Sequence, residues 1–216
     1  MMEPVATRKY EQRLRAETAD ETRRRVLAAV HDHLTEDPTR QLSLDKVARN
    51  AGVARSTIYG SFGSKAGLLD AFAEDLWARS GLAALTEAVA HSDVREHVRG
   101  GIVAATRMFA AERDVYRALF SMAKLDPGSV GAAVDRMQRD RRGGTAHLAQ
   151  RLADADLLRD GISVEEAAHI LWILTSFESF DTLATDRGLA PDEIAALLNR
   201  TVEWALYNTS TVERQS

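Results

Sequence analysis

Two short apolar helices separated by a glycine turn are the feature that most constrains what this chain can fold into. Ser43 predicts the start of the first helix, because its hydroxyl can accept a hydrogen bond from a free amide of the first turn. Gly52 predicts its end, since glycine adopts a left-handed backbone at little cost. Apolar residues recur between them at helical spacing: Leu44, Val47, Ala48 and Ala51.

A second short helix is expected from about Arg55, with Ile58 and Phe62 turned inward. Helix, glycine turn and helix is the layout of a helix-turn-helix, which places its second helix in a DNA major groove. A three-helix packing unit with a solvated polar face has the same spacing, so the pattern by itself leaves both interpretations open.

The polar side chains of this second helix suit a DNA contact. An arginine can reach base edges, guanine best, and hydroxyls suit phosphate oxygens. Ser64 can cap the following helix, whose first turn then carries Lys65 and forms an anion site. The predicted DNA contacts are Ser43, Arg55, Ser56, Thr57, Tyr59, Ser61 and Lys65.

The run from Leu42 to Leu69, with Ala51-Gly52-Val53, Thr57-Ile58-Tyr59 and Ser64-Lys65 at fixed spacing, resembles the signature of the TetR family of bacterial ligand-responsive repressors. The resemblance implies that four of the positions above contact operator DNA: Arg55, Thr57, Tyr59 and Lys65. Ala54 departs from the family, which prefers a Ser or Thr cap there, at a cost of about 1 kcal/mol. Gly60 and Ser61 replace larger side chains, which predicts weaker or narrower base readout.

Composition favours an all-α protein. The chain has 216 residues, 45% of them apolar, with only four prolines and no cysteine. Neither a disulfide nor a thiolate metal site can therefore form. The net charge is −4, yet residues 1–62 carry eleven Lys and Arg against nine Asp and Glu, which leaves −6 for the remainder. The N-terminal part is thus the end suited to a polyanion. Without an apolar signal core or a long apolar run, we expect a soluble, cytoplasmic protein with no membrane partner.

Helix signals predict four segments. These are an arm at 1–17, a helix-turn-helix domain at 18–66, a regulatory and dimerisation domain at 67–208, and a disordered tail at 209–216. A capping box at Thr18-Ala19-Asp20-Glu21 predicts the start of the first helix, whereas the arm is expected to be mobile or loosely helical. The arm either adds phosphate contacts or is a solvated extension.

The regulatory part is expected to be a series of helices. A long helix should run from Ser64 to about Ala90, bending at Gly81, and further helices are expected at 94–111 and after Arg113. Asp126-Pro127-Gly128 predicts a turn, and Gly143-Gly144 should interrupt the next helix. A second capping box at Ser163 should open a helix that continues to about Gly188, and Pro191 should begin the last one.

The last two helices are apolar around most of their circumference, which favours a four-helix interface with a second copy, although burial in the monomer is the alternative. This region also resembles the dimerising part of TetR-type regulators. The predicted interface residues are Leu174, Phe177, Phe180, Leu197, Val202 and Trp204.

Aromatic and methionine side chains of the middle helices are either core or the lining of a pocket. TetR-type proteins enclose an effector pocket in this region, and adaptable Met and aromatic side chains suit an apolar or aromatic molecule. Arg107 or His169 could fix its polar end. The predicted pocket residues are Trp77, Arg107, Phe109, Tyr116, Phe120, Met137, His169 and Trp172.

Catalysis is not expected, and no cofactor or metal is predicted. Glu166-x-x-His169 has the spacing used in di-metal helical bundles, but such a site needs a second pair of this kind, and the chain has none. The prediction is a dimeric repressor that binds a palindromic operator and is released by a small molecule. A di-metal carboxylate enzyme and a helical protein that has lost operator binding are the alternatives.

Overall fold

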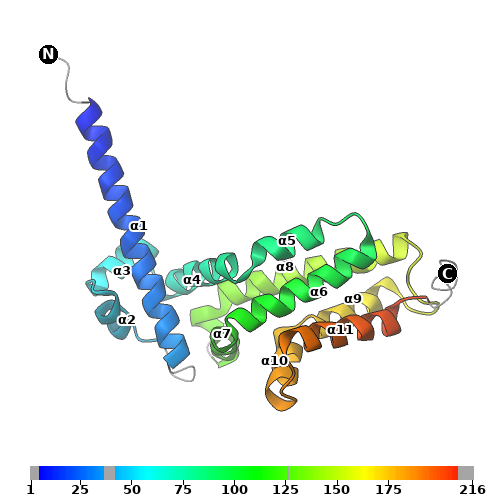
Figure 1. Ribbon diagram of the computed structural model, residues 1–216. Helices are drawn as coiled ribbons and strands as arrows, with labels where there is room; N and C mark the ends of the chain where they lie inside the picture. The colour runs from blue at the N-terminus through cyan, green and yellow to red at the C-terminus, as the bar shows by residue number, and fades with distance from the viewer. Residues whose placement is uncertain (1–4, 37–41, 126, 209–216) are drawn as a thin grey trace. The chain divides into compact units, whose positions relative to one another are not determined.

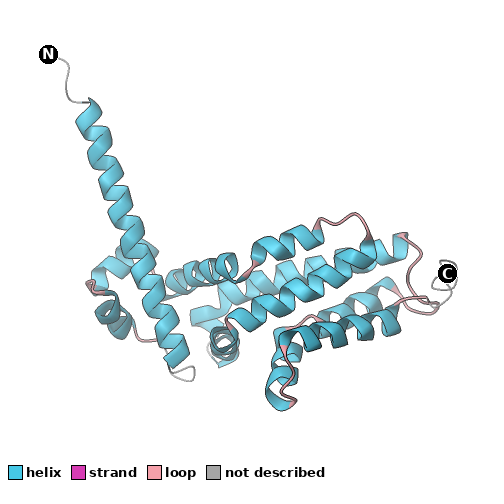
Figure 2. Cartoon of the chain, in the orientation of Figure 1, coloured by secondary structure: helices cyan, strands magenta, loops and turns pink. Residues whose placement is uncertain are grey.

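The structure is a computed structural model that describes residues 5–36, 42–125 and 127–208. These residues fold into α-helices and their connections, as Figures 1 and 2 show, so the expected all-α class is confirmed. The only β-type pairing among them is an isolated bridge between Leu158 and Tyr207. The helices are α1 (Val5–Glu36), α2 (Leu44–Ala51), α3 (Arg55–Phe62), α4 (Lys65–Ser80), α5 (Leu82–Val89), α6 (Val94–Ala111), α7 (Arg113–Leu125), α8 (Pro127–Asp154), α9 (Val164–Leu174), α10 (Phe177–Asp186) and α11 (Pro191–Leu206).

The chain divides into two compact units. The first contains Met1–Asp75 and Ala118–Ala133, and the second contains Leu76–Arg117 and Val134–Ser216. Within the described residues, no helix offers a stretch long and apolar enough to cross a membrane.

In the first unit, α1 packs against α2, and α2 packs against α3. The buried side chains are the apolar residues that recur at helical spacing in each element, as the sequence predicts. They include Val26, Val30 and Leu34 of α1, Val47 of α2, Ile58 of α3, and Leu68, Leu69 and Phe72 of α4.

In the second unit, α6 packs against both α5 and α11, and α11 also contacts α9 and α10. Asp93 caps α6 by accepting hydrogen bonds from the amides of Arg95 and Glu96 at 2.7 and 3.2 Å. The expected capping box of α9 is confirmed, because Ser163 Oγ accepts from the Glu166 amide at 3.1 Å and the Glu166 carboxylate accepts from the Ser163 amide at 3.0 Å.

The first helix begins earlier than predicted. The capping box at Thr18 is wrong, because α1 runs without a break from Val5 and Thr18 lies in its interior. The hydroxyl of Thr18 donates to the carbonyl of Leu14 at 2.8 Å instead of capping a helix start. Residues 5–17 are rich in Arg, Lys, Glu and Ala, which sustain a helix. Residues 1–4 of the predicted arm and the predicted tail at 209–216 lie outside the described residues.

The other helix limits differ from expectation in four places. The long helix after Ser64 does not merely bend at Gly81 but divides there into α4 and α5, with Gly81 at φ 117°. Helix α8 continues through Gly143 and Gly144, because the buried side chains that follow hold it in place despite the low helix propensity of glycine. Of the predicted turn at 126–128, Asp126 is not described and Pro127 begins α8.

The fourth difference is a break in the apolar stretch after Ser163. One helix to Gly188 was expected, but α9 ends at Leu174 and α10 begins at Phe177. Thr175 Oγ1 donates to the Leu171 carbonyl at 2.7 Å, and Ser176 Oγ accepts from the Ser179 amide at 3.1 Å as the cap of α10. Hydroxyl side chains compete for backbone groups in this way, and here they stop one helix and start another.

Candidate nucleic-acid interface and effector pocket

The turn between α2 and α3 has the predicted geometry. Ser43 Oγ accepts from the Lys46 amide at 3.3 Å, which confirms Ser43 as the N-cap of α2. Gly52 has φ 64° and ψ 38°, and its amide and that of Val53 donate to the carbonyls of Arg49 and Ala48 at 3.1 and 3.0 Å. A residue with a Cβ would be strained at this φ. Gly52 therefore permits the turn that fixes the direction of α3.

Helix α3 has one buried face and one exposed face. Ile58 is fully buried, whereas the opposite face carries exposed polar side chains and the half-buried Thr57. Ala54 precedes the helix with no side-chain capping bond, as predicted. The exposed residues of α3 that were predicted to contact DNA are Arg55, Ser56, Tyr59 and Ser61.

Arg55 is held by two neighbours on the exposed face. Its Nη1 donates to both oxygens of the Asp45 carboxylate, at 3.2 and 3.4 Å, and its Nη2 donates to the Tyr59 hydroxyl at 3.2 Å. The guanidinium carbon lies 5.7 Å from the centre of the Tyr59 ring. The hydrogen bond with Tyr59 and the charge of Asp45 raise the pKa of Arg55. The sequence reasoning missed Asp45, although it stands in the first turn of α2, ten residues before Arg55.

The start of α4 has the predicted cap. Ser64 Oγ accepts from the Gly67 amide at 2.9 Å, and the half-buried Lys65 is the first residue of the helix. Gly67 is required here, because a Cβ at this position would lie 2.2 Å from the Phe62 carbonyl oxygen. In addition, Arg23 of α1 places its guanidinium carbon 4.8 Å from the centre of the Phe62 ring, a cation–π contact between α1 and α3.

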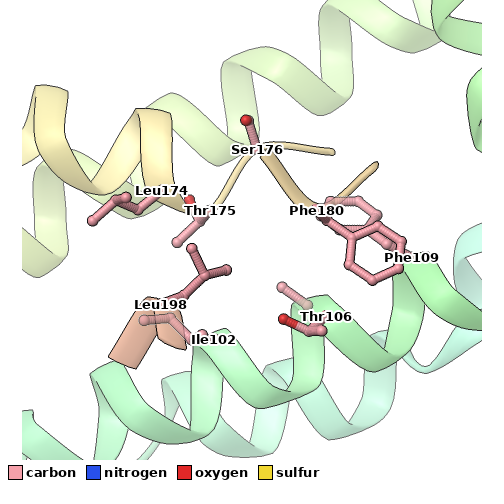
Figure 3. Close-up of a pocket in the computed structure, with 9 residues that line it drawn as sticks. Ile102, Thr106, Phe109, Leu174, Thr175, Ser176, Phe180 and Leu198 are labelled. Atoms are coloured by element: carbon pink, nitrogen blue, oxygen red, sulfur yellow. The ribbon is translucent and has the colours of Figure 1, made fainter. Parts of the chain in front are cut away.

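A small apolar pocket lies in the second unit between α6, the α9–α10 connection, α10 and α11 (Figure 3). Its volume is about 10 Å³, room for about one water molecule. The pocket is lined by Ile102, Ala105, Thr106, Phe109, Leu174, Thr175, Ser176, Phe180 and Leu198.

Of the eight predicted pocket residues, only Phe109 lines this pocket. Tyr116 is fully buried with its hydroxyl 3.1 Å from Ser80 Oγ, and Phe120 is a buried residue of the first unit. Arg107 and His169 are exposed, and Arg107 pairs with Asp192 at 3.4 Å. The remaining three, Trp77, Met137 and Trp172, are half-buried outside the lining.

Aromatic packing explains why the pocket is small. The ring of Phe109 meets those of Tyr116 and Phe177 edge to face at 5.4 Å and lies 6.0 Å from that of Phe180. These rings pack against one another and occupy the space that a larger pocket would need. Periodicity could not distinguish such a cluster from a pocket lining, because both place apolar side chains on the inner face of a helix.

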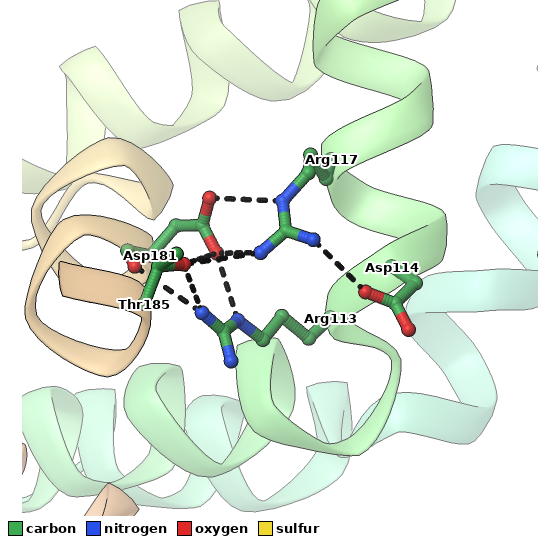
Figure 4. Close-up of polar contacts among 5 residues, drawn as sticks. All are labelled: Arg113, Asp114, Arg117, Asp181 and Thr185. Carbon is green, nitrogen blue, oxygen red and sulfur yellow. Dashed lines mark hydrogen bonds and ion pairs between the residues drawn. The ribbon is translucent and has the colours of Figure 1, made fainter. Parts of the chain in front are cut away.

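Helix α10, which forms part of the pocket wall, is tied to α7 by charged contacts (Figure 4). The Asp181 carboxylate accepts from Arg113 Nε at 2.8 Å and from Arg117 Nε and Nη2 at 3.1 and 2.7 Å. Both arginines also donate to Thr185 Oγ1. Burial raises the pKa of the Asp181 carboxyl, but the hydrogen bonds and charges of Arg117 and Arg113 outweigh it and lower that pKa.

The connection between α9 and α10 is held from α8. Arg141 Nη1 donates to the Trp172 carbonyl at 2.7 Å and to Thr175 Oγ1 at 3.4 Å. Its guanidinium carbon lies 3.4 Å from the centre of the Trp172 ring, and burial lowers the pKa of Arg141 to about 10. Arg141 is therefore part of the packing between α8 and the α9–α10 connection.

The residues predicted to form the dimer interface differ in their burial within the single chain. Phe177, Phe180 and Val202 are buried in the single chain, where they are part of the core of the second unit. Leu174 and Leu197 are half-buried, and Trp204 of α11 is 78% exposed. Ile173 of α9, which was not predicted, is 61% exposed.

The arrangement gives no support to the di-metal alternative. The Glu166 carboxylate accepts from the Ser163 amide and hydroxyl, both at 3.0 Å, as part of a helix cap, and His169 is exposed. No group of three or more His, Asp or Glu side chains in the described part of the chain could hold a metal ion.

Comparisons with known proteins agree with this geometry. The sequence model of bacterial regulatory proteins of the tetR family matches residues 26–72. Among curated proteins, no sequence matches the chain at a significant level.

Several solved structures share the fold. Native NalD of Pseudomonas aeruginosa, the secondary repressor of the MexAB-OprM multidrug efflux pump, is 22% identical with a TM-score of 0.71 over 88% of this chain and 99% of its own. A TetR-like transcriptional regulator from Rhodococcus sp. RHA1 is 22% identical with a TM-score of 0.59, over 85% of this chain and 93% of its own. A protein of unknown function from the same organism is 26% identical with a TM-score of 0.66, over 87% and 96%.

These similarities establish the fold, and the matched segment is the one that contains α2, the glycine turn and α3. The match to a family of regulatory proteins favours the DNA-binding interpretation of the helix-turn-helix over a packing unit alone. Residues 26–72 thus match the tetR family of bacterial regulatory proteins, and the fold of the chain is shared with solved TetR-type regulators.

Proposed function

We propose that this regulator is a repressor that binds a palindromic operator as a homodimer and releases it when a small molecule binds the second unit. The observation that carries the proposal is the two-sided character of α3. Its inner residue Ile58 is fully buried, and its outer face presents Arg55 and Tyr59 from a helix-turn-helix. Helices of this kind place such a face against base edges in the major groove.

Each outward side chain has a role that its chemistry suits. Arg55 contacts a base edge, preferably guanine, and Ser56 and Thr57 donate to phosphate oxygens. The Tyr59 oxygen accepts from Arg55, so its own O–H remains to donate to a phosphate. Lys65 contacts phosphate from the first turn of α4, where an anion also removes the conflict between its charge and the helix dipole.

Dimerisation supplies the second half-site contact. In a dimer, the two helix-turn-helix domains (the heads) lie about one helical turn of duplex apart and read a palindrome. The binding free energies of the two heads combine. The exposed apolar side chains of the paired helices α9 and α11, Ile173 and Trp204, suit the contact with the second copy. Leu197, half-buried on α11, joins them.

The effector is an apolar or aromatic small molecule. A pocket of about 10 Å³ is far below the several hundred Å³ that a drug-sized molecule occupies. Effector binding therefore requires α10 and its connection to α9 to shift, and it selects a conformation with a larger pocket. Helix α4 continues from the head into the second unit, so a conformation that the effector favours can change the spacing of the two heads.

The experiment that tests DNA recognition is selection of binding sequences from a random duplex pool with the purified protein. We expect a palindrome whose half-sites lie about one helical turn apart. Failure to enrich any sequence would contradict the proposal and favour a helical protein that has lost operator binding. A thermal-shift screen of small aromatic molecules, followed by displacement of the selected operator, tests the effector.

Two substitutions test the residue roles on the selected operator. Arg55→Ala should weaken it by roughly 1–3 kcal/mol and relax discrimination at one base pair. Lys65→Ala should weaken all sequences similarly and flatten the salt dependence, because it removes a phosphate contact. Arg139→Ala, at an exposed arginine of α8 in the second unit, is the matched control and should leave binding unchanged. Unaltered binding by both test variants across salt concentrations would refute these roles.

A further inference from the structure

Asp45 of α2 holds the recognition arginine of α3 from the neighbouring helix. Its carboxylate accepts two hydrogen bonds from Arg55 Nη1, at 3.2 and 3.4 Å, while Tyr59 accepts one from Nη2 at 3.2 Å. The guanidinium is thus fixed at two of its nitrogens by residues on different helices. Both partners of the ion pair are exposed, with side-chain exposures of 52% for Arg55 and 60% for Asp45.

This arrangement is unusual for a surface whose partner is a polyanion. A carboxylate beside the contact arginine lowers the local positive charge and repels phosphates, so it cannot add to the attraction between this surface and any duplex. The first helix of a helix-turn-helix crosses the DNA backbone, which brings an acid on that helix near phosphates. The repulsion between this carboxylate and the phosphates weakens binding to every sequence alike. Any benefit of the carboxylate must therefore lie in discrimination between sequences.

Orientation supplies that benefit. A free arginine has many rotamers and pairs readily with any phosphate oxygen, whereas a bidentate contact with guanine needs the planar guanidinium in one orientation. Asp45 holds Nη1 and Tyr59 holds Nη2, which restricts the rotamers of the side chain before DNA arrives. The guanidinium has five N–H groups, so those that these bonds do not use remain for a base.

We propose that Asp45 is a positioning residue for sequence discrimination, which orients Arg55 for a base edge and opposes its pairing with phosphates. This inference rests on the proposed function, in which Arg55 contacts a base. It assigns to α2 a part of the specificity that α3 alone would not have.

Asp45 also stands in the first turn of α2, where a carboxylate stabilises the helix dipole. A role confined to helix stability would change the melting temperature and the affinity for all duplexes together. It would not change the ratio between the selected operator and other sequences, nor depend on the presence of Arg55. The discrimination ratio therefore separates the two roles.

The test measures dissociation constants of four proteins, wild type, Asp45→Asn, Arg55→Ala and the double variant. Three duplexes are used: the selected operator, the same operator with the base pair read by Arg55 replaced, and an unrelated sequence. For Asp45→Asn we expect binding to the unrelated duplex to tighten about two- to fivefold, as one repulsive charge is removed. Discrimination at the replaced base pair should fall by about fivefold or more. In the Arg55→Ala background, Asp45→Asn should leave that discrimination unchanged.

Glu36→Gln is the matched control for net charge. Glu36 is an exposed carboxylate of the same unit that pairs with Lys46 at 3.1 Å, whereas Arg55 pairs with Asp45, so the loss of the Glu36 charge should not alter discrimination. The proposal is overturned if Asp45→Asn retains the wild-type discrimination ratio, or if it lowers that ratio equally with and without Arg55. If the wild type selects an operator and either of these results is found, operator binding stands and only the role of Asp45 is refuted. A wild type that selects no operator removes both.

Discussion

At the scale of single residues, His97 of α6 is a buried histidine held in its neutral form. It is 3% exposed, and Arg151 Nη1 donates to its Nδ1 at 2.7 Å. Burial, followed by the charge of Arg151, lowers the pKa of His97 to about 4. Arg151 also donates to the carbonyls of His91 and Ser92, so the connection between α5 and α6 is tied to α8 through the same side chain.

The stability of the fold should therefore decrease in mild acid. Below about pH 6.5 a histidine of the unfolded chain takes up a proton, whereas folded His97 does not until about pH 4. The free energy of unfolding should fall through this window by at most about 3 kcal/mol on account of this residue, with the contribution fully present above pH 6.5. Urea unfolding at a series of pH values measures it.

The control for this pH dependence is a histidine that is not buried. His97→Gln should flatten the slope between pH 6.5 and 4, whereas His169→Gln, at an exposed position, should not. An equal slope for wild type and His97→Gln would show that other groups cause the acid sensitivity.

At the scale of elements, α3 lacks a cap that its backbone could use. Ala54 has φ −73° and ψ 149°, the extended conformation of an N-cap residue, but no side chain that accepts a hydrogen bond. Ala54→Ser should stabilise the first unit by about 1 kcal/mol. The measurement is the hydrogen-exchange protection of the α3 amides together with the unfolding midpoint. Ala78→Ser, on the exposed surface of α4, is the control and should be neutral or slightly destabilising.

Helix α10 depends on one carboxylate for its attachment to α7. Asp181→Asn removes the charge that accepts from Arg113 and Arg117, so Arg113 loses this half-buried ion pair and Arg117 keeps only its pair with the more exposed Asp114. We expect a loss of about 2 kcal/mol in stability, and faster hydrogen exchange in α10 than in α11. Asp114→Asn removes a more exposed carboxylate that pairs with the same Arg117 at 3.1 Å, and should cost less than about 0.5 kcal/mol. Equal effects of the two substitutions would contradict the role of Asp181.

The elements also show how far sequence patterns predict this fold. Ser43 and Gly52 set the two ends of α2 and the turn before α3, whereas Asp93 and Pro191 set the starts of α6 and α11. Such limits follow from nearby residues because a cap or a stop acts on backbone groups within a few residues. Gly143 and Gly144 failed as stop signals, since packing outweighs propensity in a long helix. The break at Thr175 and Ser176 was not predicted, because apolar residues continue on both sides of it.

At the scale of the whole molecule, the proposed operator recognition depends on dimerisation. Trp204 is 78% exposed in the single chain, so Trp204→Asp should leave the monomer folded but place a charge in the proposed interface with the second copy. We expect a monomer in sedimentation experiments and operator affinity reduced by at least about tenfold, because the two half-sites no longer combine. Leu125→Asp, at an 84% exposed residue of α7, is the control and should remain dimeric. A dimeric Trp204→Asp variant would place the interface elsewhere.

The sequence by itself determined the helix-turn-helix, its caps and the outward face of α3, because every interaction that defines them joins residues close in the chain. It could not determine which aromatic side chains line the pocket and which fill the core, since Phe109, Tyr116 and Phe177 have the same helical periodicity in either role. Nor could it identify Asp45 as a partner of Arg55 or Asp181 as a partner of Arg113 and Arg117. Those pairs were decided by the tertiary structure, because only the packing of one helix on another brings charges from separate elements to within hydrogen-bonding distance.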